Sequence, residues 1–363
     1  MTRIVMKFGG TSVADLERIG KAADRVKAEW EAGREIVVVV SAMAGATNHL
    51  VELASDASPI HDAREYDSIV ATGEQVTSGL MAIMLQARGV PARSWLGWQI
   101  PIRTDDAHGK ARIDRIETDE IIRRFGERQV AVAAGFQGLG SDGRVTTLGR
   151  GGSDTSAVAL AAALKADRCD IYTDVDGVYT CDPRIVAKAQ RLDRITYEEM
   201  LEMASLGAKV LQTRSVEMAM KHGVRLRVLS TFTSPVGDET AGTYVVDEEE
   251  IMEQAVVSGV AYSRDEAKIT LTGVPDRPGV AASIFGPLSD ATVNVDMIVQ
   301  DVSVKDGLTN MTFTVGQGDL ARAETILRER AEEIGYVDLT SDGDVVKVSV
   351  IGMGMRSHAG VAQ

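Results

Sequence analysis

Two glycine-rich turns, far apart in the sequence, carry residue types that hold anions. The first runs from Lys7 to Ser12 (Lys-Phe-Gly-Gly-Thr-Ser) and the second from Gly149 to Asp154 (Gly-Arg-Gly-Gly-Ser-Asp); each joins an apolar run to a helix-like stretch. Glycines let the backbone approach a ligand, and the N–H groups at the start of the following helix favour phosphate or carboxylate. Because one turn carries Lys7 and the other Arg150, the sequence predicts that two anionic reactants are held together, as phosphoryl transfer requires.

Neither turn has a standard nucleotide-binding pattern. The P-loop spacing and the Gly-x-Gly-x-x-Gly spacing are both absent. The alternative for either turn is tight packing of a strand against a helix, where only glycine fits. That alternative is weaker for two turns that each carry a cation than for one.

Composition narrows the class of protein. A chain of 363 residues suggests two or three domains, and its net charge of −14 argues against a nucleic-acid partner. Cys169 and Cys181 lack metal-site spacing and favour reduced thiols, and no metal-binding cluster is expected. Because the longest apolar stretch is too short for a bilayer, we expect no membrane contact and a cytoplasmic location.

The first 235 residues have the pattern of an α/β domain. Apolar runs at 37–40, 130–133 and 169–172 predict buried strands, while 15–29 and 75–88 predict helices. Thr196 and Glu199 have capping-box spacing at the start of a further helix. The expected fold class is a mostly parallel sheet sandwiched by helices, followed by a smaller ferredoxin-like domain.

Residues 236–254, rich in turn formers and acidic side chains, are predicted to be a linker. The stretch 268–340 then predicts a strand, a helix, two strands, a helix and a strand. The strands are expected at 268–274, 293–304, 308–315 and 336–340, and the helices at 278–290 and 319–333. With a preceding strand, this βαββαβ unit is assigned to residues 255–345.

An internal repeat follows the small unit. The pattern at Lys268–Gly273 and Gly279–Ala281 recurs at Lys347–Gly352 and Gly360–Ala362. Residues 346–363 are therefore expected to begin a truncated second unit, or one that another subunit completes.

An ordered set of segments resembles the aspartate kinases, which belong to the amino acid kinase family and carry C-terminal ACT repeats. The segments are Lys7–Ser12, Ser41–Thr47, Gly73–Glu74, Gly135–Phe136, Thr147–Asp154, Thr173–Arg184 and Gly207–Val210. The resemblance implies transfer of the ATP γ-phosphoryl group to the β-carboxylate of aspartate. That nucleophile, with a pKa near 3.9, is already ionised at neutral pH, so no catalytic base is required.

The resemblance also implies the roles of individual residues. Catalysis falls to Lys7, Gly9, Gly10 and Asp154; aspartate binding to Ser41, Thr47, Glu74, Phe136, Arg150 and Ser153; and nucleotide binding to Lys7, Gly10, Thr173, Asp174, Tyr179, Arg184 and Lys209. Mg²⁺ would be held mainly by ATP phosphates and water. Taken singly, Lys7 could be a solvated lysine, Glu74 and Asp154 first-turn helix acids, and Tyr179 a packing residue.

In the ACT part, the resemblance implies feedback inhibition by an amino-acid effector, lysine or threonine. Because effector sites in that family lie between ACT units, a truncated second unit would weaken this inhibition. Its contacts would be Asp276, Gly279, Asn294 and Gln300, and ACT pairing would give a homodimer or a heterotetramer. The alternative is a purely structural dimerisation module. For the whole chain, the rivals are another amino acid kinase and a nonenzymatic amino-acid sensor.

Overall fold

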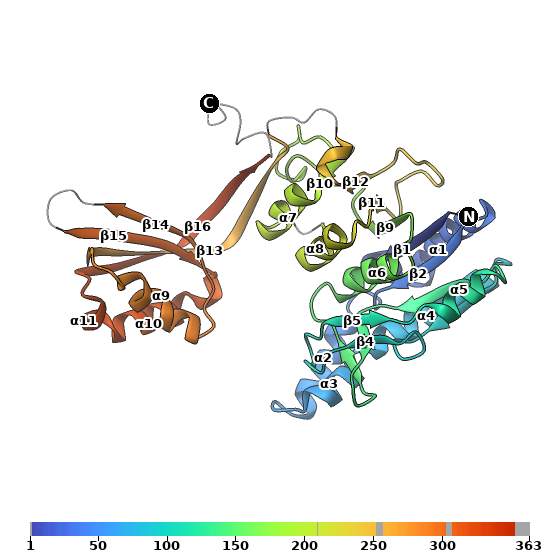
Figure 1. Cartoon of the computed structure of the whole chain (residues 1–363), viewed down its shortest axis with the longest axis horizontal. Helices are drawn as coiled ribbons and strands as arrows, with labels where there is room; N and C mark the ends of the chain where they lie inside the picture. The colour runs from blue at the N-terminus through green and yellow to red at the C-terminus, as the bar shows by residue number, and fades with distance from the viewer. Residues whose placement is uncertain (1, 209, 252–256, 303–306, 353–363) are drawn as a thin grey trace. The chain divides into compact units, whose positions relative to one another are not determined.

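The computed structural model describes residues 2–208, 210–251, 257–302 and 307–352. The chain forms two compact units, one of residues 1–260 with 350–363 and one of residues 261–349 (Figure 1). The first unit holds both glycine-rich turns, and the second holds the predicted βαββαβ pattern.

The first unit is built on an eight-stranded sheet. Its pairs are parallel except for β11 with β12, which is antiparallel. In spatial order the strands are β10 (Arg194–Thr196), β12 (Thr243–Val246), β11 (Leu226–Ser230), β9 (Arg168–Thr173), β1 (Arg3–Phe8), β2 (Glu35–Val40), β6 (Val130–Ala134) and β3 (Ala92–Trp95). The predicted mostly parallel sheet is confirmed.

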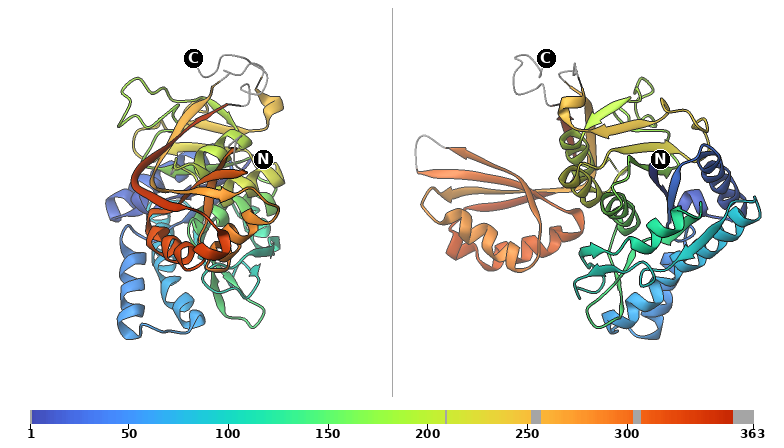
Figure 2. Two further views of the ribbon diagram at one scale, coloured as in Figure 1. Left: turned by 90° about the vertical axis from the view of Figure 1, so that its left-hand side faces the viewer. Right: turned by 45° about the vertical axis from the view of Figure 1, so that its right-hand side comes forward.

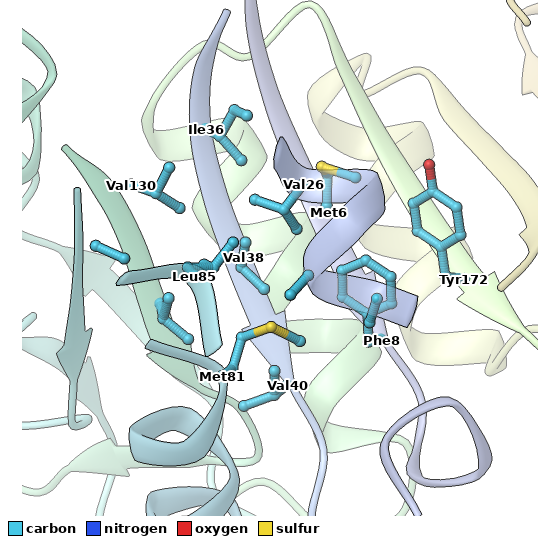
Figure 3. Close-up of a cluster of buried hydrophobic side chains, with 14 of the residues drawn as sticks. Met6, Phe8, Val26, Ile36, Val38, Val40, Met81, Leu85, Val130 and Tyr172 are labelled. Atoms are coloured by element: carbon cyan, nitrogen blue, oxygen red, sulfur yellow. The ribbon is translucent and has the colours of Figure 1, made fainter. Parts of the chain in front are cut away.

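Helices cover both faces of this sheet. One face carries α1 (Leu16–Glu31) and α4 (Thr72–Gln86), and the other carries α6 (Gly152–Ala163) with α7 (Tyr197–Ser205) and α8 (Thr213–His222). Side chains alternate along β1, so Met6 packs towards α1 while Lys7 faces α6. Figure 3 shows the core on the α1 and α4 side, where Val38 lies near Leu85 and Tyr172 lies beside Phe8 at its edge.

A second sheet of four short strands, in the order β5-β4-β7-β8, completes this unit. Its strands are β4 (Ile102–Thr104), β5 (Ile113–Ile116), β7 (Gln137–Leu139) and β8 (Val145–Thr147). The remaining helices described in this unit are the 3₁₀ turns η1 (Gly10–Val13) and η2 (Glu248–Glu250), with α2 (Ala46–Ala57), α3 (Ala63–Val70) and α5 (Asp119–Phe125). Strand β8 leads directly into the second glycine-rich turn.

One helical segment among the described residues, Ala63–Gln86, is long and apolar enough to cross a membrane by length and composition alone. It comprises α3 and α4, and half of its apolar window is buried. Met81 and Leu85 point into the core cluster that Figure 3 shows. This is the behaviour of a core helix in an α/β domain.

Part of the predicted linker belongs to the main sheet. Residues 243–246 form β12, which lies between β10 and β11. The stretch before it is also anchored, because buried Arg25 donates to the carbonyl oxygens of Thr231 and Ser234. Turn-forming residues dominate the pattern here and hide a four-residue strand.

The second unit confirms the βαββαβ order. Its elements are β13 (Gly259–Pro275), α9 (Val280–Asp290), β14 (Val295–Val302), β15 (Leu308–Val315), η3 (Gln317–Asp319), α10 (Leu320–Glu329), α11 (Ala331–Ile334) and β16 (Asp338–Ile351). The sheet order is β14-β15-β13-β16, with the helices on one face (Figure 2). Alternate side chains of β13, including Ile269 and Leu271, are fully buried in the resulting core.

The end of this unit differs from its predicted boundaries. Strand β16 is continuous through residue 346, where the sequence pattern placed the start of a second unit. It neighbours the 17-residue β13, and a long partner allows both strands to extend past the expected stop. The repeated Gly360–Ala362 motif and residues 255–256 of the preceding strand lie outside the described residues.

Candidate active site

A cleft of about 440 Å³ opens where β1, β2 and β6 end. Parallel strands place their carboxyl ends on one edge of the sheet, which is where open α/β folds bind ligands. The cleft gathers nine of the predicted site residues: Lys7, Gly10, Ser41, Thr47, Glu74, Phe136, Arg150, Ser153 and Asp154. The two glycine-rich turns, 140 residues apart, therefore meet, as the sequence suggested.

Lys7 and Asp154 form an ion pair across the cleft floor. The ammonium of Lys7 lies 2.5 Å from Asp154 Oδ1, and both side chains are about nine-tenths buried. Asp154 Oδ1 has no other partner in the described structure. Gly9 lies against the same ammonium, because a Cβ there would sit 3.3 Å from Lys7 Nζ. The pair fixes a cation beside the turn that Gly9 and Gly10 form.

Helices α2 and α6 begin at the cleft, and neither has a side-chain hydrogen bond that caps its first turn. Their N-cap residues are Gly45 and Gly151, both in the left-handed conformation with φ of 82° and 71°. Uncapped first-turn N–H groups carry partial positive charge. The start of each helix thus adds to the attraction for anions that Lys7 and Arg150 provide.

Arg150 is exposed at the cleft mouth, and its guanidinium has no hydrogen-bond or ion-pair partner within the described part of the chain. Gly149 and Gly151 flank it with positive φ values. A planar guanidinium without a partner suits two-point binding of a carboxylate or phosphate.

Glu74 supplies the opposite charge. Its side chain is 4% exposed; Oε1 accepts a hydrogen bond from the Ala42 N–H at 3.0 Å, and Oε2 is buried without a partner in the described residues. Burial raises the pKa of this carboxyl to about 7, against the opposing effect of backbone hydrogen bonds. A buried, unpaired carboxylate oxygen in a cleft is complementary to a ligand ammonium.

Close packing requires a glycine at position 135, at this edge of the sheet. A Cβ on Gly135 would lie 2.9 Å from Ser153 Oγ and 3.0 Å from the Val40 carbonyl oxygen. Phe136, the next residue, has a φ of 66°, which is strained for an aromatic residue. The turn at Gly135 and Phe136 is therefore packed tightly against Ser153, a residue that lines the cleft.

Of the predicted nucleotide residues, Lys7 and Gly10 line the cleft, whereas Thr173, Asp174, Tyr179 and Arg184 are not among its lining residues. Thr173 ends β9 next to β1, where the Gly9 N–H donates to the Tyr172 carbonyl oxygen, and Thr173 donates to Asp174. On the following loop Tyr179 donates to Asp176, and exposed Arg184 pairs with Asp182 at 2.8 Å. Lys209 lies outside the described residues.

Some cleft residues escaped the sequence analysis. Met43, Asn48 and Gln212 line the cleft, and Gln212 fills the space that a side chain on Gly151 would need. Gln212 is the N-cap residue of α8, some 60 residues after the turn it contacts. No local pattern in the sequence marks such a contact.

The predicted effector residues all lie in the second unit. Asp276 and Gly279 belong to the turn before α9, whereas Asn294 follows that helix. Because the 11-residue helix α9 is about 16 Å long, Gly279 and Asn294 lie at opposite ends of it within this unit. Gln300 is exposed on β14.

Comparison with known proteins identifies the family. The model of the amino acid kinase family matches residues 2–230, and that of the ACT domain matches residues 268–332. The aspartate kinase of Pseudomonas fluorescens is 57% identical to the chain over 367 residues, covering 100% of the chain and 87% of the relative. The aspartokinase of Pseudomonas aeruginosa is 56% identical over 364 residues, with the same coverage.

Solved structures agree with this assignment. Aspartokinase III of Escherichia coli in complex with aspartate and ADP, in the R-state, superposes with a TM-score of 0.78 at 29% identity, covering 99% of the chain and 89% of that structure. Its T-state complex with lysine and aspartate gives a TM-score of 0.74 at 29% identity, covering 96% and 87%. The chain belongs to the aspartate kinases of the amino acid kinase family, with an ACT domain after the kinase domain.

Proposed function

We propose that the cleft binds aspartate beside the γ-phosphoryl group of ATP, and that the chain transfers that group to the aspartate β-carboxylate. The product is 4-phospho-L-aspartate, the first intermediate of lysine, threonine and methionine biosynthesis. Family membership supports the reaction, and the charges in the cleft support the roles of the residues.

The observation that best supports this proposal is the charge pattern of the cleft. Aspartate presents an α-carboxylate and an α-ammonium, and the cleft offers the unpaired cation of Arg150 and the unpaired oxygen of Glu74. Arg150 would bind the carboxylate with two hydrogen bonds, and Glu74 would bind the ammonium. Ser41, Thr47, Phe136 and Ser153 would shape the rest of the pocket.

Lys7 is proposed to act on the transferring phosphoryl group. The attacking carboxylate needs no deprotonation, so the barrier comes from bringing two anions together. The Lys7 ammonium, held by Asp154, neutralises charge that moves from the γ-phosphoryl group to the leaving diphosphate. The Gly9–Gly10 backbone would donate hydrogen bonds to phosphate oxygens.

The nucleotide would lie towards Thr173, Asp174, Tyr179, Arg184 and Lys209. Of the two carboxylates that line the cleft, Asp154 is paired with Lys7, and Glu74 would be taken by the substrate ammonium. Mg²⁺ would therefore be held by phosphate oxygens and water, with Asp154 near enough to order them, and would neutralise phosphate charge.

The ACT domain would regulate the enzyme by binding lysine or threonine through Asp276, Gly279, Asn294 and Gln300. The T-state complex of the Escherichia coli relative with lysine supports an amino-acid effector. Assembly through ACT domains into a homodimer or heterotetramer, and a cytoplasmic location, complete the proposal.

A hydroxamate assay tests the reaction. The protein is incubated with MgATP, hydroxylamine and, in turn, aspartate, glutamate and N-acetylglutamate. We expect hydroxamate from aspartate only. Product from another acid, or from none, would contradict the assignment, and a boiled sample controls for nonenzymatic acylation.

A further inference from the structure

The turn that carries Arg150 is tied to the fold by a buried carboxylate. Asp67 on α3 is fully buried, and its oxygens accept hydrogen bonds from the Thr147 N–H at 3.0 Å and the Thr147 hydroxyl at 2.5 Å. The same carboxylate accepts from the Gly109 N–H at 3.1 Å and contacts His108 Nδ1 at 2.7 Å. The start of the turn and the 108–109 segment are therefore held to one helix.

A second anchor comes from α8. The guanidinium of Arg214 donates to the Leu148 carbonyl oxygen at 2.7 Å through Nη1 and to the Ala111 carbonyl oxygen at 2.8 Å through Nη2. Within the described ranges, no carboxylate lies at ion-pairing distance from it. The Ala111 N–H closes the arrangement by donating to the Thr147 carbonyl oxygen at 2.9 Å. Arg214 thus binds the carbonyl of the residue directly before the substrate turn and the carbonyl of Ala111, which pairs with the strand that leads into that turn.

Nothing else in the described structure holds the Arg150 side chain. It is exposed and unpartnered, so its direction is set by the backbone of the turn. That backbone passes through Gly149 and Gly151, which both have positive φ values, and Gly151 packs against the Gln212 side chain. The carbonyl that Arg214 binds belongs to the residue directly before Gly149. Leu148 is held from two sides, because its N–H also donates to the Phe136 carbonyl oxygen at 2.9 Å. Without the bond from Arg214, the carbonyl side of Leu148, which faces Gly149 and Arg150 along the chain, would lose its side-chain anchor.

We propose that Arg214 is a positioning residue for aspartate binding, which holds the turn so that Arg150 is aimed at the substrate α-carboxylate. This inference rests on the proposed function, in which Arg150 binds that carboxylate. Arg214 itself is absent from the residues that line the cleft, so it acts through the turn and not on the substrate. Misplacing a binding group by about 1 Å costs on the order of 100-fold in an enzyme reaction.

The first test compares steady-state kinetics of Arg214→Ala, Arg214→Lys and a matched control, Lys221→Ala. Lys221 is an exposed cation on the same helix. We expect the KM for aspartate to rise about 10- to 100-fold in Arg214→Ala and less in Arg214→Lys, which can still reach one carbonyl. The KM for ATP should stay near wild type in both, and Lys221→Ala should match wild type throughout. If Arg214→Ala does not fold, Arg214→Lys alone carries the comparison.

A merely structural role would raise both KM values together or leave both unchanged, and either result overturns the inference. The second test is a double-mutant cycle on kcat/KM for aspartate. If Arg214 acts through Arg150, Arg214→Ala should cause little further loss in an Arg150→Ala background. Fully additive losses would overturn the inference while leaving the proposed function intact. A wild-type protein that forms no acyl phosphate from aspartate would instead overturn the proposed function, and the inference with it.

Discussion

Glu74→Gln should stabilise the kinase unit at alkaline pH and remove a pH dependence of aspartate binding. The carboxyl group is 4% exposed, and one of its oxygens is buried without a partner in the described structure. Its negative charge is therefore costly until a substrate ammonium arrives. Glutamine keeps the shape and the acceptor for the Ala42 N–H but carries no charge.

The pKa of Glu74 sets the size of this effect. Burial raises it from 4.5 to about 7 in the folded protein. Because the folded state holds its proton more tightly than the unfolded state, the stabilising contribution is complete below pH 4.5 and is lost as the pH rises to 7. Between pH 5 and pH 8, the folded state should lose about 2.5 kcal/mol through this one group.

Tryptophan fluorescence reports the unfolding of the kinase unit, and so measures this loss of stability. Trp30, Trp95 and Trp98 are the three tryptophans of the chain, and all lie in the kinase unit. Denaturant unfolding of wild type and Glu74→Gln at pH 5 and pH 8 should show the variant gaining about 2 kcal/mol on wild type as the pH rises. Glu52→Gln, an exposed change on α2, should show no such gain. Parallel pH dependence of wild type and Glu74→Gln would refute the reasoning.

Kinetics provide the functional half of the same prediction. Aspartate does not titrate between pH 5.5 and 8, since its carboxyl pKa is about 3.9. In wild type, kcat/KM for aspartate should fall about tenfold per pH unit below the folded pKa of Glu74, because a neutral carboxyl cannot pair with the ammonium. Glu74→Gln should have a low and flat profile. A sloping profile in that variant would assign the titration to another group.

Three further predictions follow from the site and its support. Lys7→Ala should mainly lower kcat and Arg150→Ala should mainly raise the KM for aspartate, because only the first meets charge that develops during transfer; steady-state kinetics near wild type for both would exclude these roles. Gly135→Ala should destabilise the unit by about 1–3 kcal/mol, because its Cβ would press on Ser153 and Val40; an unchanged denaturation midpoint would contradict this. Asp170→Asn should cost about 3–5 kcal/mol in chemical unfolding, since fully buried Asp170 pairs with both Arg168 and Arg227; a loss below about 1 kcal/mol would show that the pairing is dispensable.

The sequence predicted the parts of the site that are set locally. Lys7 lies next to the end of an apolar strand, and Arg150 lies just before a helix. The residues on either side of each are enough to predict these positions. Their convergence in one cleft was inferred from two matching turns, because parallel strands share an edge. The capping box of Thr196 and Glu199 is also local, and both of its hydrogen bonds are present.

What the sequence could not show depends on distant packing. The unpaired oxygen of Glu74 results from burial under the Ala42 backbone, and the contacts of Arg214 join α8 to carbonyls about 66 and 103 residues earlier. Strand β12 and the full length of β16 exist because neighbouring strands supply hydrogen bonds that override turn-forming residues. Propensity and spacing carry no record of such partners.

The central claim is that the aspartate β-carboxylate attacks the γ-phosphoryl group in this cleft. Aspartate labelled with ¹⁸O in the β-carboxylate tests it directly, because attack by that carboxylate leaves ¹⁸O in the bond to phosphorus. The ³¹P resonance of the acyl phosphate should then show an isotope shift, and α-labelled aspartate should give none. An unshifted signal from β-labelled aspartate, or a shift from the α-labelled substrate, would contradict the account.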